Sequence, residues 1–359
     1  MADQAFHFTG TVLPSGTSTT VYVVDGRVTY EAVAGTDLVA SDVWLVPGLV
    51  DAHCHVGLGE DGGQDEASQE RQATADRDAG ALTLRDCGVP VDTRWIDDRP
   101  DLPQILRHGR HIARPKRHTR GVGIEVEPSE LVTAVEGEIA RGDGWVKLVG
   151  DWIDRDLGDI APLWPRAELE AAIARAHELG ARVTAHCFGE DALPDLVGAG
   201  IDCIEHGTGM TPEVIALMAD RQVALVPTLI NIARFPGIAE RGQKFPVYAE
   251  HMRALHRTVH ERVRAAYEAG VPIYAGTDAG SEVAHGRIAD EVAALHAAGL
   301  SASDALAAGS WAARAWLGVE DGLSEGSEAS FVVYPADPQD LAVLQHPSHV
   351  VLRGRIFPA

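Results

Sequence analysis

The sequence predicts an α/β fold, namely a (β/α)8 barrel of the TIM type with a small β-sandwich built from both chain termini. Two observations predict this architecture. Between about residue 49 and about residue 300, short apolar runs alternate with longer stretches of helical periodicity, which is typical of repeated βα units around a parallel sheet. The two chain ends instead combine alternating β-branched residues with turn signals. The 359 residues accommodate one barrel of about 250 residues and a smaller module.

Eight apolar runs are predicted to form the barrel strands. They cover residues 49–56, 81–89, 118–126, 145–153, 182–188, 201–207, 223–230 and 272–280. The segment between the fourth and fifth strands is a predicted helix, because Leu169, Ile173 and Ala176 recur every three or four residues. Gly180 then ends this helix. A closed barrel would place its active site at the carboxyl ends of the strands.

The terminal module is predicted from segments at both ends of the chain. Residues 20–30 carry valines around an Asp-Gly hairpin signal, and the tail contains the β-rich run 331–334. Neither segment can bury a core alone. We therefore predict one β-sandwich from residues 1–48 together with 319–359, and a barrel domain from residues 49–318 inserted between them.

The composition argues against several classes of partner. The chain has 53 Asp and Glu against 30 Lys and Arg, a net charge of −23, and a protein without a basic face cannot displace the counterions of a nucleic acid. No uncharged apolar run reaches about 18 residues, so we expect no membrane span. The first residues lack the pattern of a secretory signal and the four cysteines show no CxxC spacing, so we expect a reduced, cytoplasmic location. We expect a small-molecule substrate, and a homo-oligomer stays open.

The first predicted strand ends in two histidines, His53 and His55. Successive side chains of a strand point to opposite faces, so both imidazoles project to one side and Cys54 projects to the other. Two imidazoles side by side at a strand end form half of a metal site. Such a pair also arises by chance among 16 histidines, so it needs further support.

Three later strands end in residues that can bind a metal. His186 lies near the end of the fifth strand, His206 near the end of the sixth, and Asp278 near the end of the eighth. In a barrel these ends meet at one mouth, and unrelated core histidines would have no reason to occupy corresponding places. The sequence therefore predicts a metal site of four imidazoles and a carboxylate.

A lysine, Lys147, lies within the apolar fourth strand. Lysines are rarely buried without a partner. One interpretation is that Lys147 reaches water at the mouth or pairs with Asp151. The other is that burial lowers its pKa, so that the neutral amine takes up carbon dioxide as a carbamate that could bridge two cations.

Taken together, these residues resemble the amidohydrolase superfamily in its two-metal form. The chain ends add to the resemblance, because residues 47–51, Pro-Gly-Leu-Val-Asp, lead into the histidines. The spacing of Gly322, Gly326 and Ala329 is similar to the entry to the C-terminal strands in this superfamily, with Ser330 where an Asp is usual. The resemblance covers nearly the whole chain.

The resemblance implies a metal-dependent hydrolase with two divalent cations, for which zinc suits the imidazole and oxygen ligands. It also implies that Asp278 is the catalytic acid and base, which takes a proton from the attacking water and passes it to the leaving nitrogen. The implied ligands are His53, His55 and Asp278 for one cation, His186 and His206 for the other, and carboxylated Lys147 as the bridge between them.

Within the superfamily, the chain is similar to the branch of imidazolonepropionase-like and prolidase-like enzymes, which includes Xaa-Pro dipeptidases. The implied reaction is hydrolysis of a C–N bond in an amide, peptide or cyclic amide of a small molecule, as by a dipeptidase or an N-acyl amino acid hydrolase. The alternatives are a lactone or ester hydrolase, a deaminase, or imidazolonepropionase itself. Lys147 argues against imidazolonepropionase, and Glu190, four residues after His186 rather than three, argues against a deaminase.

Two positions depart from the prolidase-like pattern. Prolidase-like enzymes carry a Gly-Gly-His stretch after the third strand, but here the region at residues 120–125, within the predicted third strand, reads Arg-Gly-Val-Gly-Ile-Glu, and no tyrosine follows the seventh strand. We predict that Arg120 and Asn231, in loops at the mouth, contact the substrate, although loop arginines are more often solvated. Trp152, just beyond the fourth strand, is a third predicted contact, with plain packing as its alternative.

Overall fold

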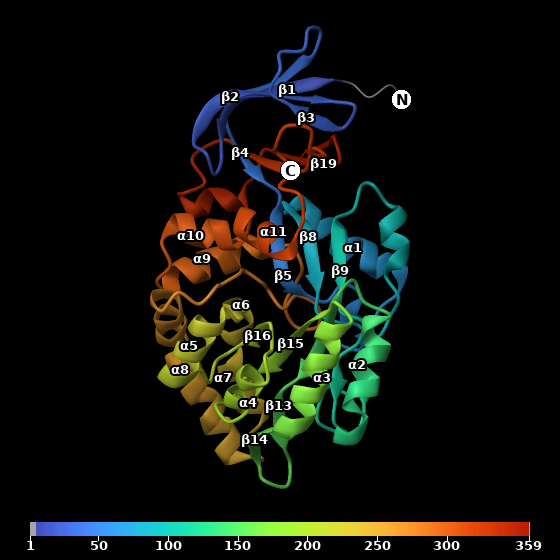
Figure 1. Ribbon diagram of the computed structural model, residues 1–359. Coiled ribbons are helices and arrows are strands. Elements are labelled where there is room, and N and C mark those ends of the chain that lie inside the picture. The colour runs from blue at the N-terminus through green and yellow to red at the C-terminus, as the bar shows by residue number, and fades with distance from the viewer. Residues whose placement is uncertain (1–4, 359) are drawn as a thin grey trace.

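The computed structural model describes residues 5–358, and Figure 1 shows a barrel below a smaller sheet that both chain ends enter. The barrel strands pair in parallel in two groups, β5-β8-β9 and β10-β12-β15-β16-β17. These strands are β5 (Leu49–Cys54), β8 (Ala81–Asp86), β9 (Gln104–Arg107), β10 (Ile112–Ala113), β12 (Trp145–Val149), β15 (Arg182–Cys187), β16 (Cys203–His206) and β17 (Ala224–Val226).

Residues 272–279 complete the barrel as its eighth strand. Leu225 of β17 forms a parallel bridge with Ile273, and Cys54 of β5 forms one with Ala279. The segment therefore joins the last strand of one group to the first strand of the other. This closed parallel arrangement agrees with the barrel predicted from the sequence.

The third strand is not the one that we predicted. It consists of β9, which pairs with β8, and of β10, which pairs with β12, whereas within 118–126 only β11 (Ile124–Glu125) pairs, on the outer side of β10. The physical reason is Arg107. Its buried guanidinium donates to Asp97 at 2.8 Å and to Asp143 at 3.3 Å, so a charged residue occupies a buried strand position. A search for apolar runs does not find such a strand.

Helices cover the outside of the barrel (Figure 1). They are α1 (Glu66–Asp78), α2 (Leu131–Ile139), α3 (Arg166–Glu178), α4 (Leu193–Gly198), α5 (Pro212–Arg221), α6 (Leu229–Ile232), α7 (Phe235–Arg241), α8 (Pro246–Glu268), α9 (Ile288–Ala298), α10 (Ala302–Ala308) and α11 (Trp311–Leu317). Between β12 and α3 the chain forms a hairpin of β13 (Asp151–Asp154) and β14 (Asp159–Pro162). Another short hairpin joins β6 (Leu58–Gly59) to β7 (Gly62–Gly63). Among residues 5–358, none of the helices combines the length and apolar character needed to cross a bilayer.

Both chain ends contribute to one seven-stranded sheet, in the order β20-β19-β18-β4-β1-β2-β3. Its strands are β1 (Phe6–Val12), β2 (Thr17–Val24), β3 (Arg27–Thr29), β4 (Asp37–Pro47), β18 (Phe331–Tyr334), β19 (His349–Leu352) and β20 (Arg355–Pro358). Along β18, Phe331 and Val333 belong to the core of this sheet, while Val332 and Tyr334 belong to the barrel core. The sheet is therefore packed onto the barrel. The domain boundaries near residues 48 and 319 stay a prediction.

Helix α8 is tied to loops at the barrel mouth by His251. Its Nδ1 lies 2.9 Å from Asp159 Oδ1 at the start of β14, and its Nε2 lies 2.9 Å from Glu190 Oε2 after β15. The hydrogen bond with Glu190 is the largest cause that raises the pKa of His251 to about 9; partial burial opposes it and Asp159 adds to it. Arg262 shares Glu190 at 3.3 Å. At neutral pH His251 is therefore protonated on both nitrogens and donates to both carboxylates.

Replacing His251 by Gln is expected to flatten the loss of stability at alkaline pH. Because the folded pKa of about 9 exceeds the unfolded value of 6.5, the stabilising interaction is complete below the unfolded value and is lost as the pH rises through the folded one. From about pH 6 to about pH 10, the free energy of unfolding should fall by about 1 kcal/mol more in the wild type than in H251Q, since solvent screens this partly exposed group. Urea unfolding at several pH values measures the difference.

The matched control for this prediction is H260Q, which changes an exposed histidine of the same helix. The pH dependence of H260Q should follow the wild type. Equal pH slopes in H251Q and the wild type would contradict the prediction.

Candidate metal centre and active site

The six residues predicted as metal ligands come from five different strands of the barrel. His53 and His55 lie at the end of β5, Lys147 in β12, His186 in β15 and His206 at the end of β16. Asp278 lies near the end of the eighth strand, residues 272–279. All six are buried except Asp278, whose side chain is 18% exposed. The barrel therefore delivers residues that are far apart in the chain to its carboxyl-terminal mouth.

Three ligand-type atoms approach each other most closely. His53 Nε2 lies 3.3 Å from His55 Nε2, and these two atoms lie 3.1 and 3.0 Å from Asp278 Oδ1. His206 belongs to the same cluster, because one ligand atom each of His53, His206 and Asp278 lie within 4.8 Å of one another. Several electron pairs in so small a volume repel each other unless a positive charge lies among them. The cluster is therefore suited to hold a cation.

The outer nitrogens of these imidazoles have partners of their own. Nδ1 of His53 lies 2.7 Å from Glu205 Oε2, and Nδ1–H of His55 donates to the carbonyl oxygen of Gly88 at 3.0 Å. Such partners fix the tautomer and the ring orientation of a metal-binding histidine. With Nδ1 occupied in this way, each Nε2 is left to face Asp278.

Glu205 connects the site to a second, deeper layer of charge. Its Oε1 accepts a hydrogen bond from Arg85 Nη1 at 2.8 Å, and the Thr184 hydroxyl also donates to Oε1. All of these groups are fully buried. Burial alone would raise the pKa of Glu205, but the charges of Arg85 and His53 hold it well below its usual range. The carboxylate is therefore ionised and attracts a positive charge to His53.

Sequence reasoning missed Glu205 because Glu205 and His206 are consecutive, and consecutive strand side chains normally face opposite sides. Both face the barrel interior here, since His206 has a left-handed backbone with φ of 67° at the strand end. Asp278, with φ of 59°, also departs from strand geometry. Strained backbone of this kind is concentrated at functional sites. One sequence signal could have identified the ion pair of Glu205 and Arg85, because each of these charged residues lies within an otherwise apolar strand.

A closed ring of seven aromatic side chains surrounds the mouth. Neighbouring ring centroids are between 4.6 and 5.2 Å apart. Seven side chains form this circle, which we call the aromatic ring of the mouth. In order they are His53, His55, His111, His118, Trp152, His186 and His206. Four of the six predicted metal ligands therefore share one wall with His111, between β9 and β10, with His118, which follows β10, and with Trp152 of β13.

His111 and His118 are the two members of the ring that sequence reasoning missed. The predicted third strand at 118–126 begins at His118 and excludes His111, whereas in the structure His111 lies between β9 and β10 and His118 follows β10. Burial lowers the pKa of His118 to about 4 and that of His111 well below its usual value, so both rings are neutral. Nδ1 of each ring is buried without a hydrogen-bond partner among the described residues. Both rings can therefore bond to a ligand in the mouth.

Lys147 is buried next to this ring. Its side chain is 1% exposed, and its Nζ makes no hydrogen bond within residues 5–358. The pairing with Asp151 that we considered is not formed, because the Asp151 carboxylate accepts the backbone N–H groups of Phe188 and Gly189 instead. An isolated buried ammonium group is costly, so Lys147 requires a partner that the described side chains do not supply.

The three predicted substrate contacts lie in different surroundings. The Trp152 ring lies between His118 and His186, at centroid distances of 4.9 and 5.2 Å, and so lines the mouth. Asn231 donates from Nδ2 to Asp278 Oδ2 at 2.6 Å, so its amide is already engaged with a residue of the site. Arg120 is exposed, and within the part of the chain that the structure describes no hydrogen bond or ion pair joins it to the aromatic ring. The structure thus brings two of the three to the site.

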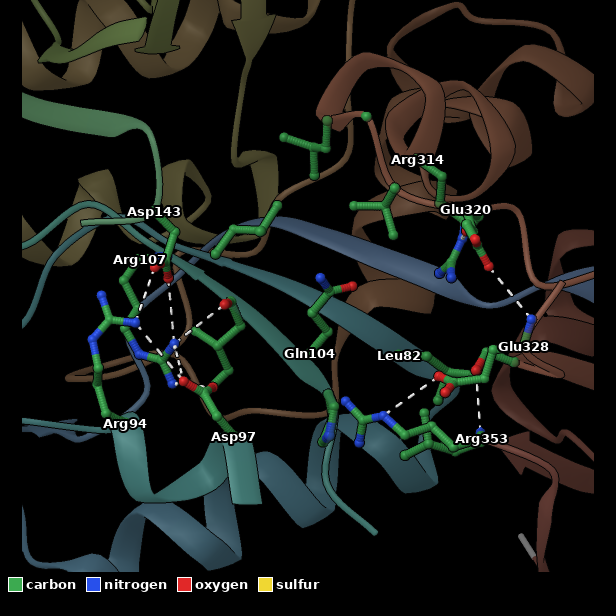
Figure 2. Close-up of a pocket in the computed structure, with 18 of the residues that line it drawn as sticks. Leu82, Arg94, Asp97, Gln104, Arg107, Asp143, Arg314, Glu320, Glu328 and Arg353 are labelled. Carbon is green, nitrogen blue, oxygen red and sulfur yellow. Dashed lines mark hydrogen bonds and ion pairs between the residues drawn. The ribbon is translucent and has the colours of Figure 1, made fainter. Parts of the chain in front are cut away.

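A separate cavity of about 740 Å³ lies between the barrel and the terminal sheet (Figure 2). It contains none of the aromatic-ring residues. Most of its charged side chains form ion pairs, as Figure 2 shows for Arg107 with Asp97 and Asp143 and for Arg353 with Glu328. Its lining therefore offers paired charges, whereas the unpaired polar atoms described above lie at the mouth.

Comparison with known proteins gives matches over most of the chain. Residues 152–357 match the amidohydrolase family. A Mycobacterium tuberculosis protein, itself named only as uncharacterized, is 57% identical over 353 residues, which are 98% of this chain and 95% of that protein. Ochratoxinase of Aspergillus niger is 25% identical over 367 residues, covering 87% of this chain and 75% of that enzyme.

Solved structures give the same picture at lower identity. A crystal structure of a Xaa-Pro dipeptidase with methionine bound in its active site is similar with a TM-score of 0.83 and 21% identity, over 99% of this chain and all of that one. The crystal structure of the ochratoxinase is similar with a TM-score of 0.79 and 21% identity, over 99% of this chain and 96% of that one. At this identity the likeness shows a shared fold, which confirms the fold class predicted from the sequence.

Proposed function

The chain belongs to the amidohydrolase family and is a hydrolase of carbon–nitrogen bonds, and from this premise we propose that it cleaves an amide, peptide or cyclic amide bond of a small molecule at the barrel mouth. The observation that carries the proposal is the convergence of His53, His55, His206 and Asp278 on one small volume. No packing requirement brings three imidazoles and a carboxylate from three separate strands to one point.

The residues present fit divalent cations. Nζ of Lys147 and Nε2 of His186 are buried without hydrogen-bond partners among the described side chains. Buried polar atoms of this kind normally have a partner, and a bound cation or its bridging group would supply one. We propose His53, His55 and Asp278 as ligands of one cation, His186 and His206 as ligands of a second, and carboxylated Lys147 as the bridge. Zinc suits this donor set. When bound, the cations would supply a water of lowered pKa and an electrophile for the scissile carbonyl.

Asp278 is the proposed general acid and base. Burial alone would raise its pKa, but the charge on His53 and the hydrogen bonds from His53 and His55 hold the pKa well below its usual range, so the carboxylate is ionised. Asn231 holds Oδ2 at 2.6 Å and so fixes the plane of the carboxylate. Asp278 accepts a proton from the attacking water and returns it to the leaving nitrogen.

We propose dipeptides and N-acyl amino acids as the substrate class. Support comes from the names of the similar proteins, since the Xaa-Pro dipeptidase acts on a dipeptide and holds the amino acid methionine in its active site. The two neutral histidines His111 and His118 and the Trp152 ring offer hydrogen bonds and an apolar surface to such a molecule. A lactone or ester hydrolase, a deaminase and imidazolonepropionase are the alternatives that the assay below separates.

The test is hydrolysis of a substrate panel by the zinc-loaded protein, by protein treated with a chelator, and by protein reloaded with zinc. The panel contains dipeptides with and without C-terminal proline, N-acyl amino acids, lactones, aminopurines and imidazolone propionate. We expect cleavage of dipeptides or N-acyl amino acids that the chelator abolishes and zinc restores. Chelator-resistant cleavage, or cleavage of lactones alone, would refute the proposal.

Replacing Lys147 by Met is expected to remove one bound cation per chain and to lower kcat by about 100-fold or more, because the bridging group and its charge are lost. Methionine fills a similar buried volume, so the fold should persist. Metal analysis and intact mass of protein prepared with bicarbonate measure both effects, and the mass of the wild type should exceed its sequence mass by one carbon dioxide. Lys244, which is exposed, provides the control variant K244M. Equal metal content in K147M and the wild type would disprove the bridging role.

A further inference from the structure

The short helix α6 begins without the cap that its sequence offers. Thr228 precedes it, and a threonine at this position normally accepts a hydrogen bond from a backbone N–H of the first turn. Here no such bond forms, because the Thr228 hydroxyl lies 2.7 Å from Nδ1 of His206. Thr228 also has a left-handed backbone with φ of 49°. Another group therefore has to accept the first N–H groups of α6.

That acceptor is Glu291 of helix α9. The backbone N–H of Leu229 donates to Oε1 at 2.8 Å, and the backbone N–H of Ile230 donates to Oε2 at 2.9 Å. Glu291 is fully buried. Helix α9 follows the eighth strand, which carries Asp278, so this carboxylate connects the last βα unit to the loop after β17.

The α6 turn holds two residues of the site. Thr228 contacts His206 from the start of the turn, and Asn231 donates to Asp278 from within it. A small displacement of the turn would therefore change the orientation of one proposed ligand and of the proposed acid and base together.

We propose that Glu291 is a positioning residue for the reaction, because its carboxylate fixes the α6 turn through which Thr228 orients His206 and Asn231 orients Asp278. This inference rests on the proposed function. Glu291 is fully buried, and both of its carboxylate oxygens are engaged by backbone N–H groups, so it acts through these groups. A glutamine has nearly the same shape but accepts with only one of its two polar atoms, so its NH₂ group would face a backbone N–H.

Burial raises the pKa of Glu291 to about 8, although the hydrogen bonds from Ile230 and Leu229 oppose this shift, so the kinetic comparisons below are made at pH 9, where the carboxylate is ionised. Placing an ionisable carboxylate in this position is therefore costly for the fold. The geometry accounts for it, since only a carboxylate can accept from both N–H groups at once.

The test compares Glu291→Gln with the wild type on the panel substrate that the wild type cleaves best. We expect kcat to fall by about 10- to 100-fold while KM and zinc content stay within about twofold, as for groups that orient ligands from behind. Hydrogen exchange of the backbone amides of residues 229–232 should speed up in the variant. Asp290→Asn, one residue earlier on the same helix, is the matched control and should match the wild type in every measurement.

A double-mutant cycle with Asn231→Ala tests the route of the effect. If Glu291 acts through the α6 turn, the loss of kcat caused by E291Q should be clearly smaller in the N231A background than in the wild type, because one of the two contacts that it positions is already gone while the contact of Thr228 with His206 remains. Additive losses would overturn the proposed route.

Glu291→Asp covers the case in which E291Q does not fold. It keeps the buried charge but withdraws the carboxylate from α6, so the same loss of kcat is expected. Wild-type kcat in either folded variant would show that Glu291 has no role in the reaction. Failure of both variants to fold would show that its role is purely structural, and either result would overturn the inference. A wild-type protein that cleaves no C–N substrate would refute the proposed function instead, whereas unchanged amide exchange in E291Q would refute this inference alone.

Discussion

Replacing Asp278 by Asn should lower kcat by about 10²- to 10⁴-fold, which is the usual contribution of a positioned proton acceptor and donor. The amide keeps the shape of the carboxylate and can still lie beside His53 and His55, but it cannot accept and return a proton. The loss should appear in kcat with a smaller change in KM, because the interaction matters most in the transition state. Steady-state kinetics on the best panel substrate measure the effect.

Metal content has to be measured on the same D278N sample, since Asp278 is both a proposed ligand and the proposed acid and base. Assays at saturating zinc separate the two roles. Excess zinc restores the occupancy of the metal site, but it does not restore the proton transfer that Asp278 is proposed to perform. Asp156, exposed at the tip of the β13–β14 hairpin, gives the control variant D156N. If zinc-saturated D278N had the kcat of the wild type, the proposed mechanism would be wrong.

The convergence of the proposed ligands could be predicted because barrel geometry leaves little freedom. Parallel strands end on one side, so His53, His186 and Asp278 had to meet once eight strands were assigned. Strand alternation placed His53 and His55 on one face, and they are indeed 3.3 Å apart at Nε2. An error of one whole strand, at 118–126, did not affect the predicted convergence because none of the proposed ligands lies on the third strand.

The parts that sequence reasoning missed depend on buried charge and on backbone strain. Arg107 occupies β9 only because Asp97 and Asp143 neutralise it from other segments, and the sequence gives no sign of that contact. The error hid His118, which contacts Trp152 across the mouth. Glu205 could not be predicted from strand alternation, because His206, which follows it, has a left-handed backbone that interrupts the alternation of side chains between the two faces.

Buried charge also sets the orientation of His53. Glu205 joins His53 to Arg85, and the guanidinium carbon of Arg85 lies 4.1 Å from the centre of the Trp145 ring. Each group in this series neutralises or shields the one before it, so none can be removed without exposing the next. The orientation of His53 therefore depends on residues that never reach the mouth.

Replacing Arg85 by Met should destabilise the protein by about 3–5 kcal/mol, because it leaves the Glu205 carboxylate buried without its main counter-charge. The pKa of Glu205 should then rise, and His53 should lose the anion that fixes its tautomer, so zinc affinity should also fall, by about 10- to 100-fold. Urea unfolding of the metal-free proteins measures the first effect, and competition with a zinc chelator measures the second.

Arg182 offers a matched control for this variant. Its guanidinium carbon also lies 4.1 Å from the centre of the Trp145 ring, but it is only half-buried and donates to the carbonyl oxygen of Trp316 instead of to a carboxylate. R182M should therefore lose only about 1 kcal/mol, the worth of a cation–π contact. Adding Glu205→Gln to R85M should recover part of the stability, since both charges are then gone. If R85M were as stable as R182M, Arg85 would not be the main counter-charge of Glu205. The proposed dependence of His53 on Arg85 through Glu205 would then be wrong.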